Sequence, residues 1–266
     1  MNPVITIAKR AALNASRILL RHFDHLEQLN VTTKQRNDYV SEADVQAEHE
    51  IIQTLRKTYP NHGILAEESG EQRGQDEFQW IIDPLDGTTN FLHGIPHFAV
   101  SIAFRHRNRL EAALVHDPIR QEMFTASRGE GAQLNDHRIR VSGIMQLENA
   151  LLGTGFPFRY PQHQKAYLNF FNKLFGRCVE IRRLGAASLD LSYVAAGRLD
   201  AFWEIGLQEW DLAAGALLIQ EAGGLASDFG GGNDFMKTGN IIAGNPKLFK
   251  ALLKELQPHL GPELER

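Results

Sequence analysis

The stretch Trp80-Ile81-Ile82-Asp83-Pro84-Leu85-Asp86-Gly87-Thr88-Thr89-Asn90-Phe91 joins an apolar run to a group of polar and turn-forming residues. The apolar run predicts a strand that leads into Asp83, and we expect Pro84 to stop its ladder because proline has no N–H to donate. Gly87 permits a tight turn, and the Thr-Thr-Asn segment after it is suited to starting a helix. Two carboxylates, those of Asp83 and Asp86, are therefore expected at one strand end beside a helix N-terminus.

The carboxylates and N–H groups of this segment suit one kind of ligand. Carboxylates bind hard cations such as Mg²⁺, and the free N–H groups of a helix N-terminus bind phosphate oxygens. Side by side, they predict a site for a metal ion and a phosphate. The same residues also suit a simple turn, because Asp, Pro and Gly are common turn formers and Thr88 can cap a helix. The segment alone leaves both interpretations open.

Further acidic residues lie at the ends of other predicted elements. Glu67-Glu68 follows an apolar triplet, Asp211 lies where an apolar helix opens, and Asp44 lies in the first turn of another helix. Each has an ordinary explanation. An acidic pair after a strand is commonly a solvated loop, and an Asp at a helix start caps the helix or offsets its dipole.

The spacing of apolar residues predicts a layered α/β protein. Helical spacing covers residues 4–19 and 41–57, and Ser41 with Asp44 resembles a capping box with Asp in place of Glu. Short apolar runs predict strands, several of them in an antiparallel meander, at residues 64–66, 78–82, 98–104, 112–115 and 123–126. Further along the chain, we expect strands at residues 150–154, 178–181, 199–203 and 241–243, and helices at 164–175, 187–196, 211–222 and the C-terminus. No composition break marks separable domains.

The composition excludes several classes of protein. The 266 residues carry 28 Lys+Arg against 32 Asp+Glu, and this net charge of −4 argues against direct DNA binding through bulk positive charge. One cysteine, Cys178, excludes an internal disulfide. Basic residues interrupt the N-terminal apolar stretch, and nowhere do the roughly 20 apolar residues of a membrane span run together. We therefore expect a cytoplasmic protein that does not enter a membrane.

Three segments in order carry a family resemblance: Glu67-Glu68, then Asp83-Pro-Leu-Asp86-Gly-Thr-Thr-Asn, then Trp210-Asp211 ahead of Glu221-Ala-Gly-Gly. Together they resemble the inositol monophosphatase family, whose members are Mg²⁺-dependent, lithium-inhibited phosphomonoesterases. The resemblance covers nearly the whole chain, and residues 96–103, 154–158 and 203–207 are most similar to its bacterial, SuhB-type branch. It implies one domain over residues 1–266, an α/β/α/β/α sandwich. A large antiparallel sheet is expected in about residues 1–145, and a smaller mixed sheet in about 146–266.

The resemblance also implies the metal ligands and the catalytic residues. A first Mg²⁺ is expected on Glu67, Asp83 and the carbonyl of Leu85, and a second on Asp83, Asp86 and Asp211, with a third, weaker ion near Glu67. Glu67 and Thr88 are expected to orient the attacking water, with Asp44 supporting Thr88. Li⁺ is expected to inhibit.

The residues implied to bind substrate extend beyond the metal site. The N–H groups of Gly87 and Thr88 would cradle the phosphate, and the whole expected set is Asp86, Gly87, Thr88, Arg182, Gly185, Ala187, Glu204 and Asp211. Glu204 suits a polyol because a carboxylate accepts hydrogen bonds from hydroxyls, although a charge at a strand end is also explained by simple exposure. Animal relatives typically carry a histidine where this chain has Gln208, which puts the finer substrate preference in question.

Two functions of different classes follow from the resemblance. The first is hydrolysis of myo-inositol monophosphate or a similar small polyol phosphate, with adenosine bisphosphate, histidinol phosphate and fructose bisphosphate as alternative substrates. The second is a SuhB-like role in transcription antitermination, with RNA polymerase or Nus factors as partners. Candidate contacts for that role are Arg105, Arg107, Arg109 and Arg182-Arg183, although a charge run is usually a solvated face. A homodimer is also expected. We expect no zinc at His93 and His97, because Gly94 and Pro96 break any helical spacing between them.

Overall fold

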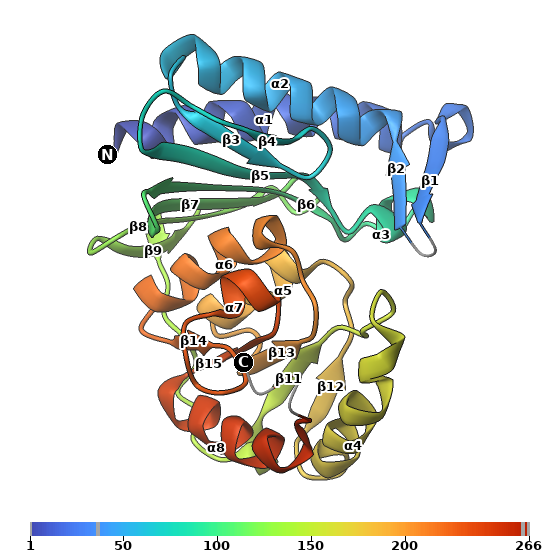
Figure 1. The fold of residues 1–266 in the computed structure, drawn as a ribbon, viewed down its shortest axis with the longest axis vertical. Coiled ribbons are helices and arrows are strands. Elements are labelled where there is room, and N and C mark those ends of the chain that lie inside the picture. The colour runs from blue at the N-terminus through green and yellow to red at the C-terminus, as the bar shows by residue number, and fades with distance from the viewer. Residues whose placement is uncertain (1, 36–37, 262–263, 265–266) are drawn as a thin grey trace.

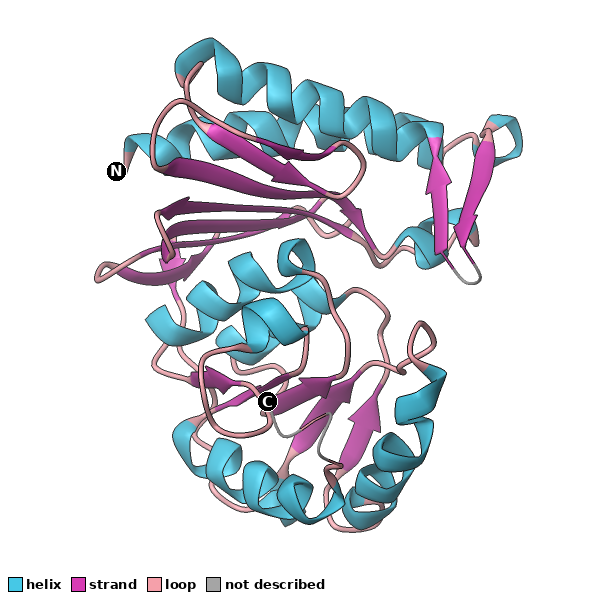
Figure 2. Ribbon diagram, viewed as in Figure 1, coloured by secondary structure: helices cyan, strands magenta, loops and turns pink. Residues whose placement is uncertain are grey.

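A computed structural model of the chain describes residues 2–35, 38–261 and 264, and its helices and sheets alternate in five layers (Figures 1 and 2). Helices α1 (Pro3–Phe23) and α2 (Glu42–Thr58) lie over an eight-stranded sheet. Helices α5 (Ala187–Ala195) and α6 (Glu209–Glu221) lie beneath it, followed by a five-stranded sheet and then by α4 (Gln164–Leu174) and α8 (Pro246–Leu256). The expected α/β/α/β/α sandwich is confirmed.

The larger sheet has the strand order β10-β9-β8-β7-β6-β5-β3-β4. From β5 onward each strand pairs antiparallel with the next, which confirms the meander, whereas β3 pairs parallel with β5. Its strands are β3 (Gly63–Ala66), β4 (Gly70–Gln72), β5 (Phe78–Asp86), β6 (Ala99–His106), β7 (Arg109–Asp117), β8 (Glu122–Ser127), β9 (Gly131–Leu134) and β10 (His137–Arg138). The short strands β1 (Val31–Gln35) and β2 (Asp38–Ser41) form a separate hairpin that was not expected.

The smaller sheet is mixed, as expected, with the order β12-β11-β13-β15-β14. Strand β11 runs parallel to both of its neighbours, and β15 pairs antiparallel with β13 and β14. The strands are β11 (Leu151–Thr154), β12 (Glu180–Arg182), β13 (Ala201–Glu204), β14 (Leu225–Ser227) and β15 (Ile241–Gly244). Two one-turn helices, α3 (Thr88–Leu92) and α7 (Phe235–Thr238), complete the elements that bear on the site.

Helices α5 and α6 form the layer between the two sheets, and their sequences explain why. All nine residues of α5 and the run from Leu212 to Ile219 in α6 are buried. A helix that is buried on every side needs other elements around all of it, and the polar residues Ser188, Asp190 and Ser192 of α5 are buried together with its apolar ones. By contrast, α1 buries residues at three- and four-residue spacing on one face: Ile5, Ala8, Ala11, Ala12, Ala15 and Leu19. No helix in the described part of the chain is long and apolar enough to cross a membrane.

The expectation that Pro84 ends the ladder of β5 is wrong. Asp83 pairs with Ser101, and the next pair joins Asp86 to Ala99. Between these two pairs β5 moves on by three residues and β6 by only two, so β5 has one extra residue. This is a β-bulge, which accommodates the missing N–H of proline without ending the strand. The bulge carries the strand on to Asp86.

Polar side chains tie the two halves of the chain together. The Asn90 amide donates to the carbonyl of His97 at 2.9 Å and to that of Leu184 at 2.9 Å. The Glu221 carboxylate accepts from the N–H groups of Gly129 and Gly131, both at 2.9 Å. These contacts hold α5 and α6 against the larger sheet.

Replacing Asn90 by Ala is expected to destabilise the protein by about 1–3 kcal/mol, because two carbonyls lose their donor at a position that is 7% exposed. Urea unfolding measures the difference. Asn169→Ala, at an exposed position of α4, is the matched control and is expected to change stability by less than about 0.5 kcal/mol. Equal effects in the two variants would contradict the proposed tie between the halves.

Candidate active site

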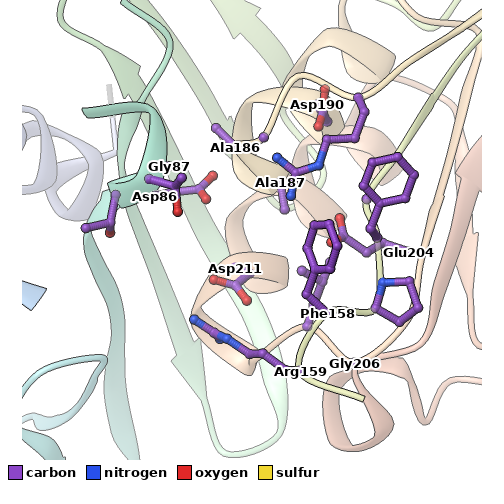
Figure 3. A pocket seen from close by; sticks show the side chains of 18 of the residues that line it. Asp86, Gly87, Phe158, Arg159, Ala186, Ala187, Asp190, Glu204, Gly206 and Asp211 are labelled. Carbon is purple, nitrogen blue, oxygen red and sulfur yellow. The ribbon is translucent and has the colours of Figure 1, made fainter. Parts of the chain in front are cut away.

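The site is a cavity of about 410 Å³ where the end of β5 meets the starts of α3, α5 and α6. In the view of Figure 3, Asp86 enters from one side and Glu204 from the other, with Asp211 between them. The cavity is lined by Glu67, Asp83, Leu85, Asp86, Gly87, Thr88, Thr89, His93, Thr154, Gly155, Phe156, Pro157, Phe158, Arg159, Tyr160, Arg183, Gly185, Ala186, Ala187, Asp190, Glu204, Ile205, Gly206, Leu207 and Asp211.

Asp83 and Asp86 project into the cavity from the bulged end of β5. One oxygen of each accepts a backbone N–H, from Leu85 at 2.9 Å and from Ser188 at 2.7 Å respectively. The Ser188 hydroxyl donates to the same Asp86 oxygen at 2.5 Å. Ser188 lies in the first turn of α5, so the second half of the chain helps to orient a carboxylate of the first.

Asp211 completes a cluster with these two residues. It is the third residue of α6 in a capping box, and one of its oxygens accepts the N–H of Gln208 at 2.7 Å. Asp211 therefore does cap its helix, and this capping uses the oxygen that accepts the Gln208 N–H. Asp83, Asp86 and Asp211 each offer an oxygen within 4.8 Å of the others, and among the described residues they are the one group with the geometry to hold a metal ion.

Burial and mutual repulsion perturb the acids of the cluster. Burial, followed by the neighbouring carboxylates of Glu67, Asp86 and Asp211, raises the pKa of Asp83 well above its ordinary value. Burial and then Asp211 raise the pKa of Asp86 to about 7, against the hydrogen bonds from Ser188. A bound cation would relieve both effects, and a set of oxygen donors suits a hard cation such as Mg²⁺.

Glu67 joins the cavity from the neighbouring strand. It follows β3, which runs parallel to β5 in a register that pairs Ala66 with Ile82, and the Glu67 N–H donates to the Ile82 carbonyl at 3.2 Å. Glu67 therefore lies at the same end of the sheet as Asp83. The solvated-loop interpretation of Glu67 does not describe this position, since Glu67 lines the cavity.

Thr88 is held on two sides. Its hydroxyl lies 3.0 Å from the Leu85 carbonyl and 3.3 Å from Asp44 Oδ1, both of which can accept its proton. The other oxygen of Asp44 accepts the N–H and the hydroxyl of Ser41 in a capping box at the start of α2. Burial raises the pKa of Asp44, and the bonds from Ser41 oppose that rise. Asp44 thus supports Thr88 in the arrangement that the resemblance implies. A carbonyl oxygen has two lone pairs, so accepting from Thr88 leaves the Leu85 carbonyl one that a cation could bind.

Gly87 brings backbone close to the cavity. Its φ is +93°, and an added Cβ would lie 3.1 Å from the His97 carbonyl and 3.2 Å from the Ala186 Cβ. Glycine suits this left-handed turn ahead of α3, because a residue with a Cβ would be strained at this φ and would crowd the His97 carbonyl and Ala186. The start of α3 therefore reaches the cavity as backbone, without a side chain over Gly87.

Glu204 forms the opposite wall together with residues that the sequence did not single out, whereas Gly185 and Ala187 lie beside Gly87 and Asp86 ahead of α5 and at its start. The Glu204 carboxyl packs directly on Gly155, where any Cβ would overlap it, so simple exposure does not describe Glu204. Burial raises the pKa of Glu204 to about 8, although Arg183 opposes the rise. Asp190 also lines this wall and is 1% exposed, and burial raises its pKa.

Arg182 does not line the cavity; its neighbour Arg183 does. The Arg182 guanidinium pairs with Glu180 at the edge of the smaller sheet, whereas that of Arg183 lies 5.6 Å from the Phe156 ring and 6.0 Å from the Phe158 ring. Arg183 is the first residue after β12, so the choice between two adjacent arginines depends on where this strand ends and on the direction of its last side chains, which only the structure shows.

The other arginines considered for partner contacts have acidic neighbours. Arg105 pairs with Glu209, and Arg107 pairs with Glu77 at 2.8 Å. Arg109 pairs with Glu111 at 2.5 Å, so the positive charge of this stretch is largely balanced.

Comparisons with known proteins agree with one another. The model of the inositol monophosphatase family matches residues 1–260. Nus factor SuhB of Pseudomonas aeruginosa is 58% identical over 100% of both chains. The extragenic suppressor protein SuhB of Bartonella henselae has a crystal structure with a TM-score of 0.95 and 45% identity, covering 97% of this chain and 100% of that one. The inositol monophosphatase of Anabaena has a TM-score of 0.84 and 35% identity, over 95% and 94% of the two chains.

The raised pKa of Glu204 predicts a pH dependence of stability in the metal-free protein. Because the folded-state pKa of about 8 exceeds the ordinary value of 4.5, this group's contribution is fully present below pH 4.5 and is lost as the pH rises to about 8. Glu204→Gln should remove that loss. Urea unfolding at pH 5 and pH 8 tests it, with the exposed Glu130→Gln as control. An equal decline in both variants would count against the assignment.

Proposed function

The chain belongs to the inositol monophosphatase family, and from that premise we propose that it hydrolyses myo-inositol monophosphate or a similar small polyol phosphate with Mg²⁺. The observation that carries the proposal is the convergence of Asp83, Asp86 and Asp211 in one cavity with Glu67. A cavity of about 410 Å³ is of the size that small ligands occupy.

In the proposed site, Glu67, Asp83 and the Leu85 carbonyl would hold one Mg²⁺, and Asp83, Asp86 and Asp211 would hold a second. A third, weaker ion near Glu67 and inhibition by Li⁺ belong to the same proposal. When bound, the ions polarise the phosphoryl group and lower the pKa of water.

The chain's own residues supply positioning. Glu67 accepts a hydrogen bond from the attacking water, and the Thr88 hydroxyl, held by Asp44, orients it. The N–H groups of Gly87 and Thr88 hold phosphate oxygens. The water oxygen attacks phosphorus in line and the ester P–O bond breaks. One proton of the water ends on the leaving alcohol and the other on the phosphate, and no phosphoenzyme forms. Phosphoryl transfer asks a protein mainly for such positioning and for charge neutralisation.

The leaving group lies between Gly185 and Ala187 on one side and Glu204 on the other, and these residues contact its hydroxyls. Asp86 accepts from a further hydroxyl. A contact between Arg182 and the substrate stays a prediction. Arg183 is better placed to contact the substrate, since it lines the cavity. Adenosine bisphosphate, histidinol phosphate and fructose bisphosphate remain alternative substrates of the same chemistry.

A second candidate function is a role in transcription antitermination. It is favoured by one observation: the Pseudomonas relative, 58% identical over its whole length, is named a Nus factor. In this proposal the chain binds RNA polymerase or Nus factors in the cytoplasm through an exposed face. A homodimer and a single domain over residues 1–266 are part of the same expectation.

Asp86→Asn is expected to lower Mg²⁺-dependent phosphate release by about 10³-fold, because metal stabilisation is worth several kcal/mol and about 1.4 kcal/mol is tenfold in rate. The assay measures inorganic phosphate from myo-inositol 1-phosphate and from the alternative substrates, with and without Li⁺. Asp234→Asn, at an exposed carboxylate, is the control. Near-wild-type release by Asp86→Asn would sink the phosphatase assignment.

The antitermination role predicts that Asp86→Asn still binds its partner. A pull-down of purified RNA polymerase at low salt compares this variant with the wild type. Equal capture supports a surface separate from the cavity. If neither protein captures the polymerase, with or without added Nus factors, the second function is wrong.

A further inference from the structure

Helix α2 carries a second buried acid one turn beyond Asp44. Glu48 is 3% exposed, and its two oxygens are both engaged. Oε2 accepts the N–H of Glu68 at 2.8 Å, and Oε1 accepts the N–H of Ser69 at 2.9 Å. Neither hydrogen bond belongs to a helix or to a sheet ladder. The Glu48 carboxylate therefore binds the backbone of the segment that follows β3.

That segment is the tight turn between β3 and β4. Ala66 pairs with Gly70 across the hairpin, and Glu67, Glu68 and Ser69 form the turn between them. Gly70, with a φ of +71°, starts the returning strand. Successive N–H groups in a turn form a concave site for an anion, and here the Glu48 carboxylate fills it.

Glu67 is the first residue of this turn, and its backbone is fixed from both sides. On one side its own N–H donates to the Ile82 carbonyl at 3.2 Å. On the other side Glu48 binds the next two N–H groups. We propose that Glu48 is a positioning residue that holds Glu67 in place for Mg²⁺. It acts through the turn's backbone, and it touches neither substrate nor metal.

The same helix face also sets Thr88. Residues four apart lie on one side of a helix, and Asp44 and Glu48 have this spacing on α2. Asp44 Oδ1 lies 3.3 Å from the Thr88 hydroxyl. One rigid helix therefore fixes both residues that the proposed function assigns to the attacking water, and the present inference rests on that function only for Mg²⁺ at Glu67.

Glutamate is the residue type that this contact requires. Two carboxylate oxygens accept two N–H groups, and such charge-assisted bonds are about twice as strong as neutral ones. Glutamine has one acceptor oxygen and would turn its NH₂ group toward the second N–H. Glu48→Gln keeps the size of the side chain and removes this match.

The test is isothermal titration of the metal-free protein with Mg²⁺. Glu48→Gln is expected to bind Mg²⁺ about 10–100-fold more weakly, the usual effect of losing a group that orients a metal ligand. Glu50→Gln is the matched control: Glu50 lies on the same helix and accepts from Asn14 and Thr54. Circular dichroism and urea unfolding confirm that each variant is folded. Affinity within about twofold of the control would overturn the inference.

Two further variants separate this role from a structural one. In a Glu67→Gln background, Glu48→Gln should weaken Mg²⁺ binding no further, because both changes act on one ligand. An additive loss would overturn the proposal. Glu48→Asp keeps the negative charge but has a shorter side chain, and it replaces Glu48→Gln if that variant does not fold. Glu48→Asp is then expected to weaken Mg²⁺ binding. Unchanged Mg²⁺ affinity would contradict the positioning role. A wild-type protein that binds Mg²⁺ but releases no phosphate would refute the proposed function and leave this test valid.

Discussion

The site depends on bringing together three carboxylates that repel one another, those of Asp83 and Asp86 buried and that of Asp211 half-buried. Asp83 and Asp86 are 1% and 8% exposed, and burial is the largest cause of the rise in the pKa of each. A buried charge is tolerated only when it is hydrogen-bonded and offset by opposite charge. Backbone N–H groups provide the first, since each carboxylate of the cluster accepts one at 2.7–2.9 Å. A cation would provide the second.

This requirement explains the meeting of the two halves at the cavity. The N–H groups that hold Asp86 and Asp211 come from the starts of α5 and α6, where helices leave N–H groups unpaired and present a partial positive charge. These helices are buried along most of their length, so they lie between the two sheets with their starts beside β5. The central layer is thus a packing core that also stabilises negative charge.

Much of this arrangement could be predicted from the sequence, because it depends on local patterns. Helical spacing identified α1 and α2, the Ser41–Asp44 capping box is present, and the resemblance placed the acids of the cluster in one cavity. The rest depends on contacts between distant segments. The bulge at Pro84 needs the partner strand β6, and the choice of Arg183 over Arg182 for the cavity needs the orientation of β12. Glu48 has no local signal, since its partners lie 20 and 21 residues away.

The cavity walls differ in what they ask of a ligand. On one side, the carboxylates of Asp83, Asp86 and Asp211 accept backbone N–H groups and need a cation to balance their negative charge. On the far wall, the pKa of about 8 leaves Glu204 protonated near neutral pH in the metal-free protein, so its carboxyl can donate one hydrogen bond and accept another. Asp190 Oδ1 is buried near it and has no hydrogen-bond partner among the described residues. Acceptor oxygens of this kind suit hydroxyls, which can donate to them. Because Arg159 and Arg183 line the same cavity and suit phosphate oxygens, this wall combines donors for a phosphate with acceptors for the hydroxyls of a polyol.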